Sequence, residues 1–143
     1  MIRSVLAVLA GIVVLTIISF GIEAAVDPLL MRMFAVTLPD AAALSRNFPA
    51  RLLMLAYTTF SIGLGGYVTA WIAKRARIWH AAIMSAVEVA FTLYVMIAAP
   101  FPEAHQAPLW WWIAGMILMV PAACLGAELR VGQSSRRTLP RVS

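Results

Sequence analysis

The stretch GGYVTAWIAKRARIWHA, residues 65–81, decides the fold that this sequence predicts. An apolar run that starts with two glycines stops at Lys74, Arg75 and Arg77, and a second apolar run follows at once. Short cytoplasmic loops of membrane proteins collect lysine and arginine, because carrying such charges across a bilayer is unfavourable. The stretch therefore predicts two membrane-spanning helices joined by a short basic turn on the cytoplasmic side.

The composition indicates that lipid is the solvent for most of the chain. Of the 143 residues, 63% are hydrophobic and 12% are charged, and the mean hydropathy is +0.91. A soluble domain usually carries about 25% charged residues. The net charge of +5 comes from basic residues that border apolar runs, which is typical of topology signals facing anionic lipid. We therefore expect no nucleic-acid partner.

Four apolar runs are long enough to cross a hydrocarbon core, which takes about 20 helical residues. They lie at about residues 5–22, 52–73, 78–99 and 109–129. The first run is longer than the apolar part of a signal peptide and lacks a good cleavage site, so we expect it to stay as a helix. The expected fold class is all-α, a four-helix transmembrane bundle over residues 1–130 with a flexible basic cytoplasmic tail over 131–143.

The basic residues also predict the orientation of the spans. With four spans, one side of the membrane receives Arg3, Lys74, Arg75, Arg77, Arg130, Arg136, Arg137 and Arg141. The other side receives Arg32, Arg46 and Arg51, all in the first loop. The excess of positive charge places both termini in the cytoplasm. Tryptophans 71 and 79 then fall at the inner interface and tryptophans 110–112 at the outer one, where amphipathic rings settle.

The segment between the first two spans carries helix-start signals. Asp27 and Pro28 are typical of an N-cap followed by a proline at the first helical position, and residues 37–40 resemble a capping box. We expect two short interfacial helices in this first outer loop, at about residues 29–36 and 40–46. An irregular loop is the alternative.

No motif of a known catalytic or cofactor site is present: HExxH, GxSxG, a Walker loop and CxxC are all missing. His80 and His105 fall on opposite sides of the membrane in this topology, so they are not expected to share a metal ion within one subunit. The single cysteine, Cys124, lies in an apolar run and is expected to be a small core residue. We expect no cofactor, no metal site and no enzymatic activity.

A polar seam is expected inside the bundle, centred on Glu88. This residue falls near the middle of the third span, where a carboxyl group costs roughly 2.5–3.5 kcal/mol or more on insertion scales. Ser85 and Thr92 share its helix face, and Thr58 and Ser61 form a similar stripe on the second span. The first span adds Thr16 and Ser19. Lipid exposure of these stripes would be unfavourable, so all three should face the interior.

No lysine or arginine lies at the depth of Glu88, so a buried carboxyl there is expected to be neutral and to need a hydrogen-bond acceptor. Ser61 is near its level, and Pro121 in the fourth span would free the carbonyl of Ile117 from its intrahelical bond. Either group is a candidate acceptor. Glu88 could be a proton-coupling or substrate-binding carboxyl, or it could only hold two helices together.

The glycines of the second span predict close helix packing. Gly63, Gly65 and Gly66 include small-xxx-small pairs with Ser61 and Ala70, which let helix backbones approach closely. Packing within the chain and contacts between copies are both open interpretations.

Three segments carry a resemblance to small uncharacterised four-span bacterial inner-membrane proteins. They are residues 65–81, the PLWWW of residues 108–112 and the PAACLGAELR of residues 121–130. The resemblance implies a bacterial inner-membrane protein and supplies no catalytic residues. We expect a structural or accessory subunit of a membrane complex; the alternatives are a small oligomeric proton-coupled transporter or channel that uses Glu88 and, third, a membrane enzyme acting on lipid. The lipid bilayer is the expected partner, together with a second copy or another membrane protein.

Overall fold

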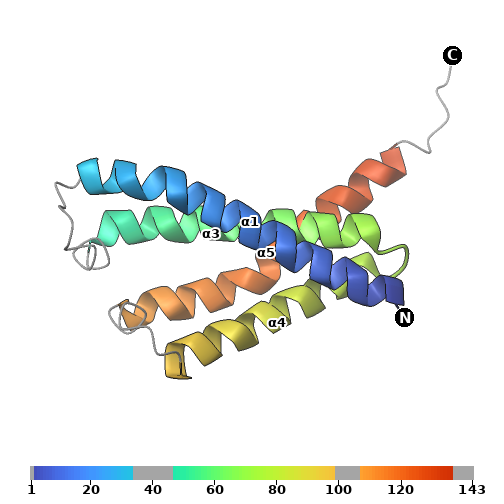
Figure 1. Ribbon diagram of the computed structural model, residues 1–143. Helices are drawn as coiled ribbons and strands as arrows, with labels where there is room; N and C mark the ends of the chain where they lie inside the picture. The colour runs from blue at the N-terminus through green and yellow to red at the C-terminus, as the bar shows by residue number, and fades with distance from the viewer. Residues whose placement is uncertain (1, 34–46, 99–106, 137–143) are drawn as a thin grey trace, which may run out of the picture.

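The computed structural model describes residues 2–33, 47–98 and 107–136, and these form four α-helices in antiparallel order (Figure 1). The helices are α1 (Ile2–Met33), α3 (Phe48–Ile72), α4 (Arg77–Ala98) and α5 (Leu109–Arg136). Each is long and apolar enough to cross a membrane. The expectation of an all-helical chain with four candidate spans is therefore confirmed.

Helix α1 departs most from its predicted bounds. It continues as one helix to Met33 and keeps Pro28 inside it, so the predicted helix start at Asp27 and Pro28 is wrong. Leu30, beyond the proline, is 2% exposed and packs with Ala50 of α3. This packing favours a continuous helix despite the hydrogen bond that a proline removes. As far as Met33, the predicted helix at residues 29–36 is the end of α1. The predicted helix at 40–46 lies outside the described residues.

Helix α5 also runs further than predicted, because residues 131–136 of the expected flexible tail are helical. Two hydrogen bonds fix this extension to the neighbouring helices. The Tyr67 hydroxyl donates to Oε1 of Gln133 at 2.8 Å, and the Arg77 guanidinium donates to Oγ of Ser134 at 3.0 Å. The rest of the predicted tail lies outside the described residues.

Local signals explain where α3 begins and ends. The side chain of Asn47 accepts a hydrogen bond from the backbone N–H of Ala50 at 3.2 Å, which is the N-cap arrangement. At the other end, Nε of Arg3 donates to the carbonyl oxygen of Ile72 at 3.1 Å and satisfies one of the last carbonyls of the helix. The connection to α4 then turns through Ala76, whose φ of 47° is in the left-handed region.

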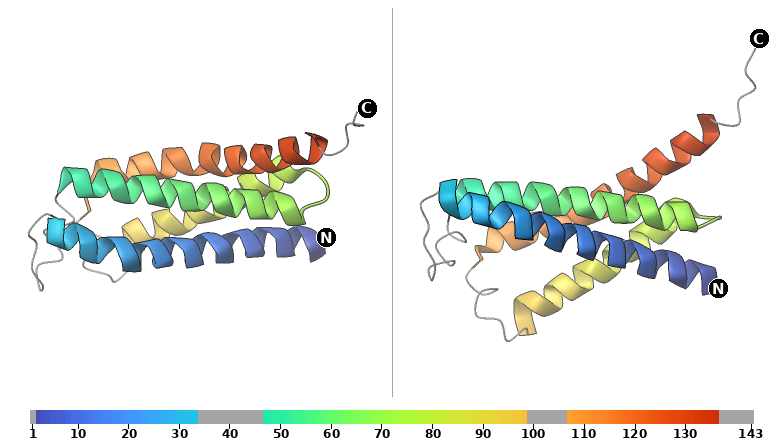
Figure 2. Two further views of the ribbon diagram at one scale, coloured as in Figure 1. Left: turned by 90° about the horizontal axis from the view of Figure 1, so that it is seen from above. Right: turned by 45° about the horizontal axis from the view of Figure 1, so that its top comes forward.

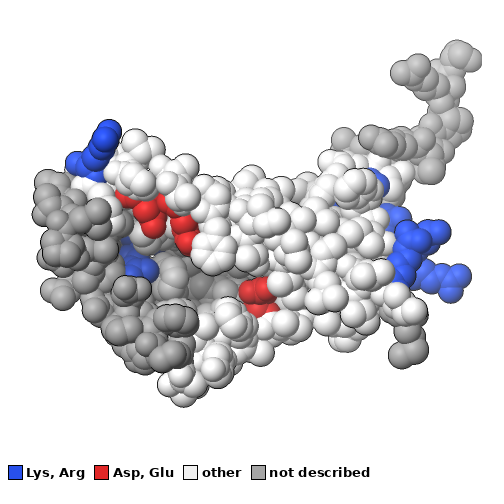
Figure 3. Space-filling model, in the orientation of Figure 1, with Lys and Arg blue, Asp and Glu red and all other residues white. Residues whose placement is uncertain are grey.

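The antiparallel order brings the start of α1, the α3–α4 connection and the end of α5 to the same end of the molecule (Figures 1 and 2). We call this the basic end, because it carries Arg3, Lys74, Arg75, Arg77 and Arg130. Figure 3 shows a group of basic side chains at that end, with others at the opposite end. Of the three basic residues of the opening stretch, Lys74 and Arg75 lie in the turn between two apolar helices, as the sequence predicts, and Arg77 is the first residue of α4.

Helices α3 and α4 form the centre of the bundle. Among the four described helices, each of these two contacts the other three, whereas α1 and α5 do not contact each other. The largest buried cluster joins all four helices in the half nearer the basic end, with Leu15, Ile62, Met84 and Ala123 among its members. The buried residues of α4, which are Ala81, Met84 and Ser85, all lie in its first half.

Glycines set the closest helix contacts in this half. A Cβ added at Gly11 of α1 would lie 2.9 Å from the carbonyl oxygen of Gly65 in α3. A Cβ added at Gly66 would lie 2.7 Å from Cα of Ala123 in α5. Towards the opposite end, α4 diverges from α1 and α3 (Figures 1 and 2). The bundle is therefore tight near the basic end and more open beyond its middle.

Candidate ligand-binding cavity

A cavity of about 240 Å³ lies where the helices begin to diverge, between the buried cluster and the end opposite the basic end. Residues from all four helices line it. These are Leu15, Thr16, Ser19 and Phe20 of α1, Leu55, Thr58 and Ile62 of α3, Glu88, Phe91 and Thr92 of α4, and Trp111, Trp112, Gly115 and Met119 of α5.

Three members of the expected polar seam line this cavity together: Glu88, Thr92 and Thr58. Glu88 and Thr92 are four residues apart on α4 and so share a helix face, and Thr58 reaches the cavity from α3. Thr16 and Ser19 of α1 complete a set of four hydroxyl groups around a single carboxyl group. Three polar stripes that are far apart in the sequence thus meet at one place in the fold.

Ser61 and Ser85, the other two members, are fully buried but do not line the cavity. The Ser61 hydroxyl donates to the carbonyl oxygen of Tyr57 at 2.9 Å, and the Ser85 hydroxyl donates to that of Ala82 at 2.9 Å. Both bonds stay within one helix. The hydroxyl groups are satisfied locally, so the two serines serve as small side chains at helix contacts.

Neither of the two acceptors expected for Glu88 forms a hydrogen bond with it within the described residues. Ser61 is engaged with its own helix, and Pro121 lies on the outward face of α5 with Ile117 exposed beside it. Within the described residues, no hydrogen bond or ion pair reaches the Glu88 carboxyl group. Whether Pro121 faces the interior or the outside depends on how α5 is rotated about its axis, and hydropathy alone does not determine that rotation. Glu88 therefore lines the cavity, and its carboxyl group makes no hydrogen bond or ion pair with the described residues.

Aromatic rings form much of the cavity wall, and the sequence analysis did not predict them there. Phe20 and Phe91 lie next to Ser19 and Thr92 in the chain, and Trp111 and Trp112 come from the tryptophan run of α5. The two indole rings pack edge to face, with centroids 5.0 Å apart. Tryptophans 110–112 were expected at the membrane interface. Two of them, Trp111 and Trp112, line the cavity, a role that was not predicted.

Charged groups of α1 and α3 lie between the cavity and the end of the bundle opposite the basic end. Glu23 is one turn beyond Ser19, and Asp27 is one turn beyond Glu23. Asp27 and Arg51 are close enough for their charges to interact, and the Arg51 guanidinium lies 4.8 Å from the centroid of a Trp111 ring. Oδ1 of Asp27 and Nε1 of Trp111 are buried and have no hydrogen-bond partner among the described residues. A mixed cluster of charge thus borders the aromatic side of the cavity.

The remaining candidate groups, two histidines and one cysteine, lie apart from the cavity as far as the structure describes them. No cluster of three or more His, Cys, Asp or Glu side chains is present in residues 2–33, 47–98 and 107–136. Nδ1 of His80 lies 2.9 Å from the carbonyl oxygen of Ala76, a contact within the first turn of its own helix. His105 lies outside the described residues. Cys124 is partly buried in α5.

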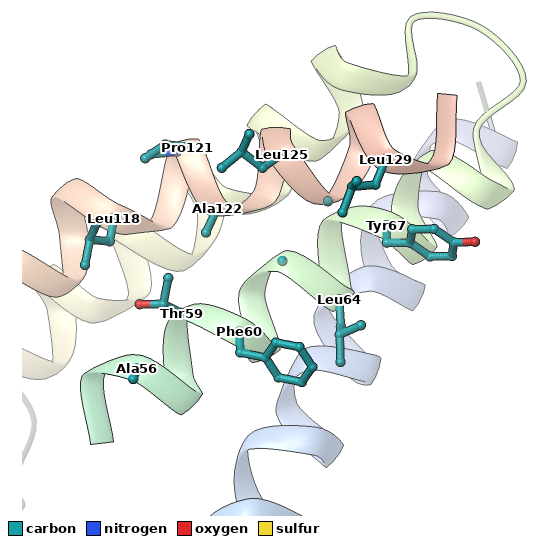
Figure 4. Close-up of a pocket in the computed structure, with 12 residues that line it drawn as sticks. Ala56, Thr59, Phe60, Leu64, Tyr67, Leu118, Pro121, Ala122, Leu125 and Leu129 are labelled. Atoms are coloured by element: carbon teal, nitrogen blue, oxygen red, sulfur yellow. The ribbon is translucent and has the colours of Figure 1, made fainter. Parts of the chain in front are cut away.

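A second hollow is an apolar groove on the outside of the bundle, between α3 and α5. Figure 4 shows Leu118, Pro121, Leu125 and Leu129 of α5 along one side, with Thr59, Phe60, Leu64 and Tyr67 of α3 along the other. Gly63 and Gly126 form its floor, where the two backbones approach closely. The predicted packing residues Gly63 and Pro121 therefore belong to this groove, while Gly65 and Gly66 lie in the buried contacts.

No protein-family model matches this sequence, and neither a curated protein nor a solved structure matches it. The resemblance to small four-span bacterial membrane proteins therefore stays a prediction. Function has to be argued from the cavity itself.

Proposed function

We propose that this chain is a four-span protein of a bacterial inner membrane that takes up and releases a proton at Glu88, as a small oligomeric proton-coupled transporter or channel does. The observation that carries the proposal is a carboxyl group, without a protein partner in the described residues, inside a cavity bordered by all four helices. Ionisable side chains within membrane spans are costly and usually mark proton or substrate pathways.

The alternative interpretation of Glu88, an interhelical hydrogen bond, loses its main support. It required an acceptor such as Ser61 or the Ile117 carbonyl, and within the described residues no hydrogen bond joins Glu88 to either group. A purely structural carboxyl group would be expected to have a fixed partner, since leaving it unpaired costs free energy. A carboxyl group that exchanges protons needs access to water or a ligand, which the cavity offers.

The orientation that we propose has both termini in the cytoplasm. It is supported by the gathering of Arg3, Lys74, Arg75, Arg77 and Arg130 at one end of the bundle. Trp71 and Trp79 lie near the same end and are 63% and 67% exposed, as side chains at a membrane interface would be.

Difference infrared spectroscopy tests the proposal directly. The carbonyl band of a protonated carboxyl group should appear and disappear as the pH of a membrane sample is changed, and Glu88→Gln should remove that band. Glu128→Gln is the matched control, since Glu128 is exposed and does not line the Glu88 cavity. Reconstituted vesicles with an internal pH dye should lose any proton flux with Glu88→Gln and keep it with Glu128→Gln. A Glu88 that never changes its protonation between about pH 5 and 9 would refute the proposal.

A second candidate function, the accessory subunit of a membrane complex, is supported by the α3–α5 groove. A groove of about 460 Å³ lined by Phe60, Leu64, Leu125 and Leu129 suits the side chains of a neighbouring helix. Purification in a mild detergent, with the mass and the co-purifying proteins determined, separates the two functions. A defined complex with another protein supports the accessory role, whereas a homo-oligomer supports transport.

A further inference from the structure

The chemistry of the Glu88 cavity restricts what could occupy it. The wall carries one carboxyl group, four hydroxyl groups and the rings of Phe20, Phe91, Trp111 and Trp112, and none of the lining residues is Lys, Arg or His. An anion would meet the carboxyl group without a compensating charge. A hard metal ion binds through oxygen atoms alone and would leave the four aromatic rings of this wall without a role.

We propose that the cavity binds a small monovalent organic cation, an ammonium group with an apolar body, with the charge at Glu88 and the apolar body against the aromatic rings. This inference rests on the proposed function, because it assigns a substrate class to the same carboxyl group. Aromatic faces attract ammonium groups within about 6 Å of the ring centroid, most strongly where water is excluded. An ionised Glu88 needs a counter-charge, and the lining residues supply none.

The charged groups around the cavity favour entry of a cation from the end opposite the basic end. Glu23 and Asp27 of α1 lie one and two turns beyond Ser19, and Arg51 and Tyr57 of α3 lie near them. Arg51 and, on α1, Arg32 balance the charges of these two carboxyl groups over the whole side. Glu23, one turn from Ser19, supplies a carboxyl group next to the cavity that attracts cations. On the other side, α4 offers Arg77 and α5 offers Glu128, and the buried cluster separates both from Glu88.

Proton and cation compete for one carboxyl group, so the exchange is balanced in charge. A protonated Glu88 and a free cation give an ionised Glu88 paired with the cation, and one proton passes to solvent. No bond other than the O–H bond is broken. The cavity of about 240 Å³ has room for a cation with about one aromatic ring and a few methyl groups, and the test compound is chosen to that size.

The test uses benzyltrimethylammonium and its neutral isostere neopentylbenzene, in which a carbon atom replaces the nitrogen atom. The full chain in detergent micelles is dialysed to equilibrium against the labelled cation, and proton release is followed with a dye in weak buffer. We expect saturable binding with up to one proton released per cation bound, and no displacement by the neutral isostere. Glu88→Gln should weaken binding by about tenfold or more and abolish proton release, since it removes a charge-assisted contact.

Two further variants keep the result independent of folding. Glu88→Asp keeps the charge and should retain proton release, and Glu128→Gln, a Glu-to-Gln change outside the cavity, should behave as the wild type. Equal binding by the wild type and Glu88→Gln, or equal competition by the neutral isostere, would overturn the inference. If the infrared band of Glu88 titrates but no cation binds, the cation inference fails while the proposed function stands. If the cation binds and Glu88 carries no proton flux, the proposed transport fails instead.

Discussion

Replacing Gly66 by alanine should destabilise the bundle, because the change adds one methyl group where the backbones of α3 and α5 approach closely. The new Cβ would lie 2.7 Å from Cα and 2.8 Å from the carbonyl carbon of Ala123, and it would overlap the carbonyl oxygen of that residue. Carbon atoms pack at about 3.5–4.0 Å, so the two backbones must separate by about 1 Å. These atoms belong to backbone, and no side-chain rotation relieves the overlap.

The expected net effect is a loss of about 1–2 kcal/mol in the free energy of unfolding. Overpacking a well-packed core costs about 1–3 kcal/mol, while alanine gains about 0.5–1 kcal/mol over glycine inside a helix. The pair α3 and α5 forms the most extensive contact among the described helices, so the separation affects much of the bundle. Unfolding in mixed micelles with increasing sodium dodecyl sulfate, followed by circular dichroism, measures the difference.

Gly63→Ala is the matched control. It changes the same helix, one turn earlier, against the same partner helix, but its Cβ would lie 3.5 Å from the carbonyl oxygen of Ala122, an ordinary contact. We expect Gly63→Ala to leave the stability unchanged or to raise it by up to about 1 kcal/mol. If the two variants unfold at the same detergent fraction, the close α3–α5 packing described here is wrong.

Three further predictions concern the ends of the helices. In a Cys124→Ala background, Met33→Cys and Gly132→Cys should be labelled by an impermeant maleimide from opposite sides of the membrane. Both positions are exposed and lie at opposite ends of the bundle. Labelling of both from the same side would contradict the topology. Changing Lys74, Arg75 and Arg77 together to Gln should give mixed orientation in that labelling assay, because it removes three charges that favour the cytoplasmic side. It should also loosen the end of α5, since Arg77 donates a hydrogen bond to Ser134. Unchanged orientation with a loss of RNA or DNA binding would show that these residues bind nucleic acid. Ala76→Gly should raise the stability by about 0.5–1 kcal/mol in the detergent assay, since a φ of 47° is unfavourable for alanine, whereas Ala73→Gly, at a φ of −69°, should not.

The sequence was sufficient for the four long apolar helices and for the polar stripes, because hydropathy and helical period determine both. Glu88, Thr92 and Thr58 meet in the cavity since each stripe has to turn away from lipid. The end of α1 was not predictable in the same way. Asp27 and Pro28 are typical of a helix start, and only the burial of Leu30 against α3 explains why the first helix continues through them.

The details of the cavity depend on helix rotation, which the pattern leaves undetermined. Three consecutive tryptophans point in directions about 100° apart on a helix, so the sequence cannot tell which of them face the interior. Trp111 and Trp112 line the cavity, whereas the Trp110 ring packs against Phe48 with centroids 5.2 Å apart. In the same way, a hydroxyl group such as that of Ser61 can bond its own helix or a neighbour, and only the structure distinguishes the two.

The lack of contact between α1 and α5 has a consequence for the order of folding. Residues 73–76 join α3 to α4, so this hairpin closes with little loss of chain entropy, and each outer helix then docks on it independently. Since synthesis begins at the N-terminus, α1 reaches the bilayer before the helix that covers its Gly11 face has been made. We expect that face to be the surface most exposed to wrong pairing with other membrane helices while the protein is assembled.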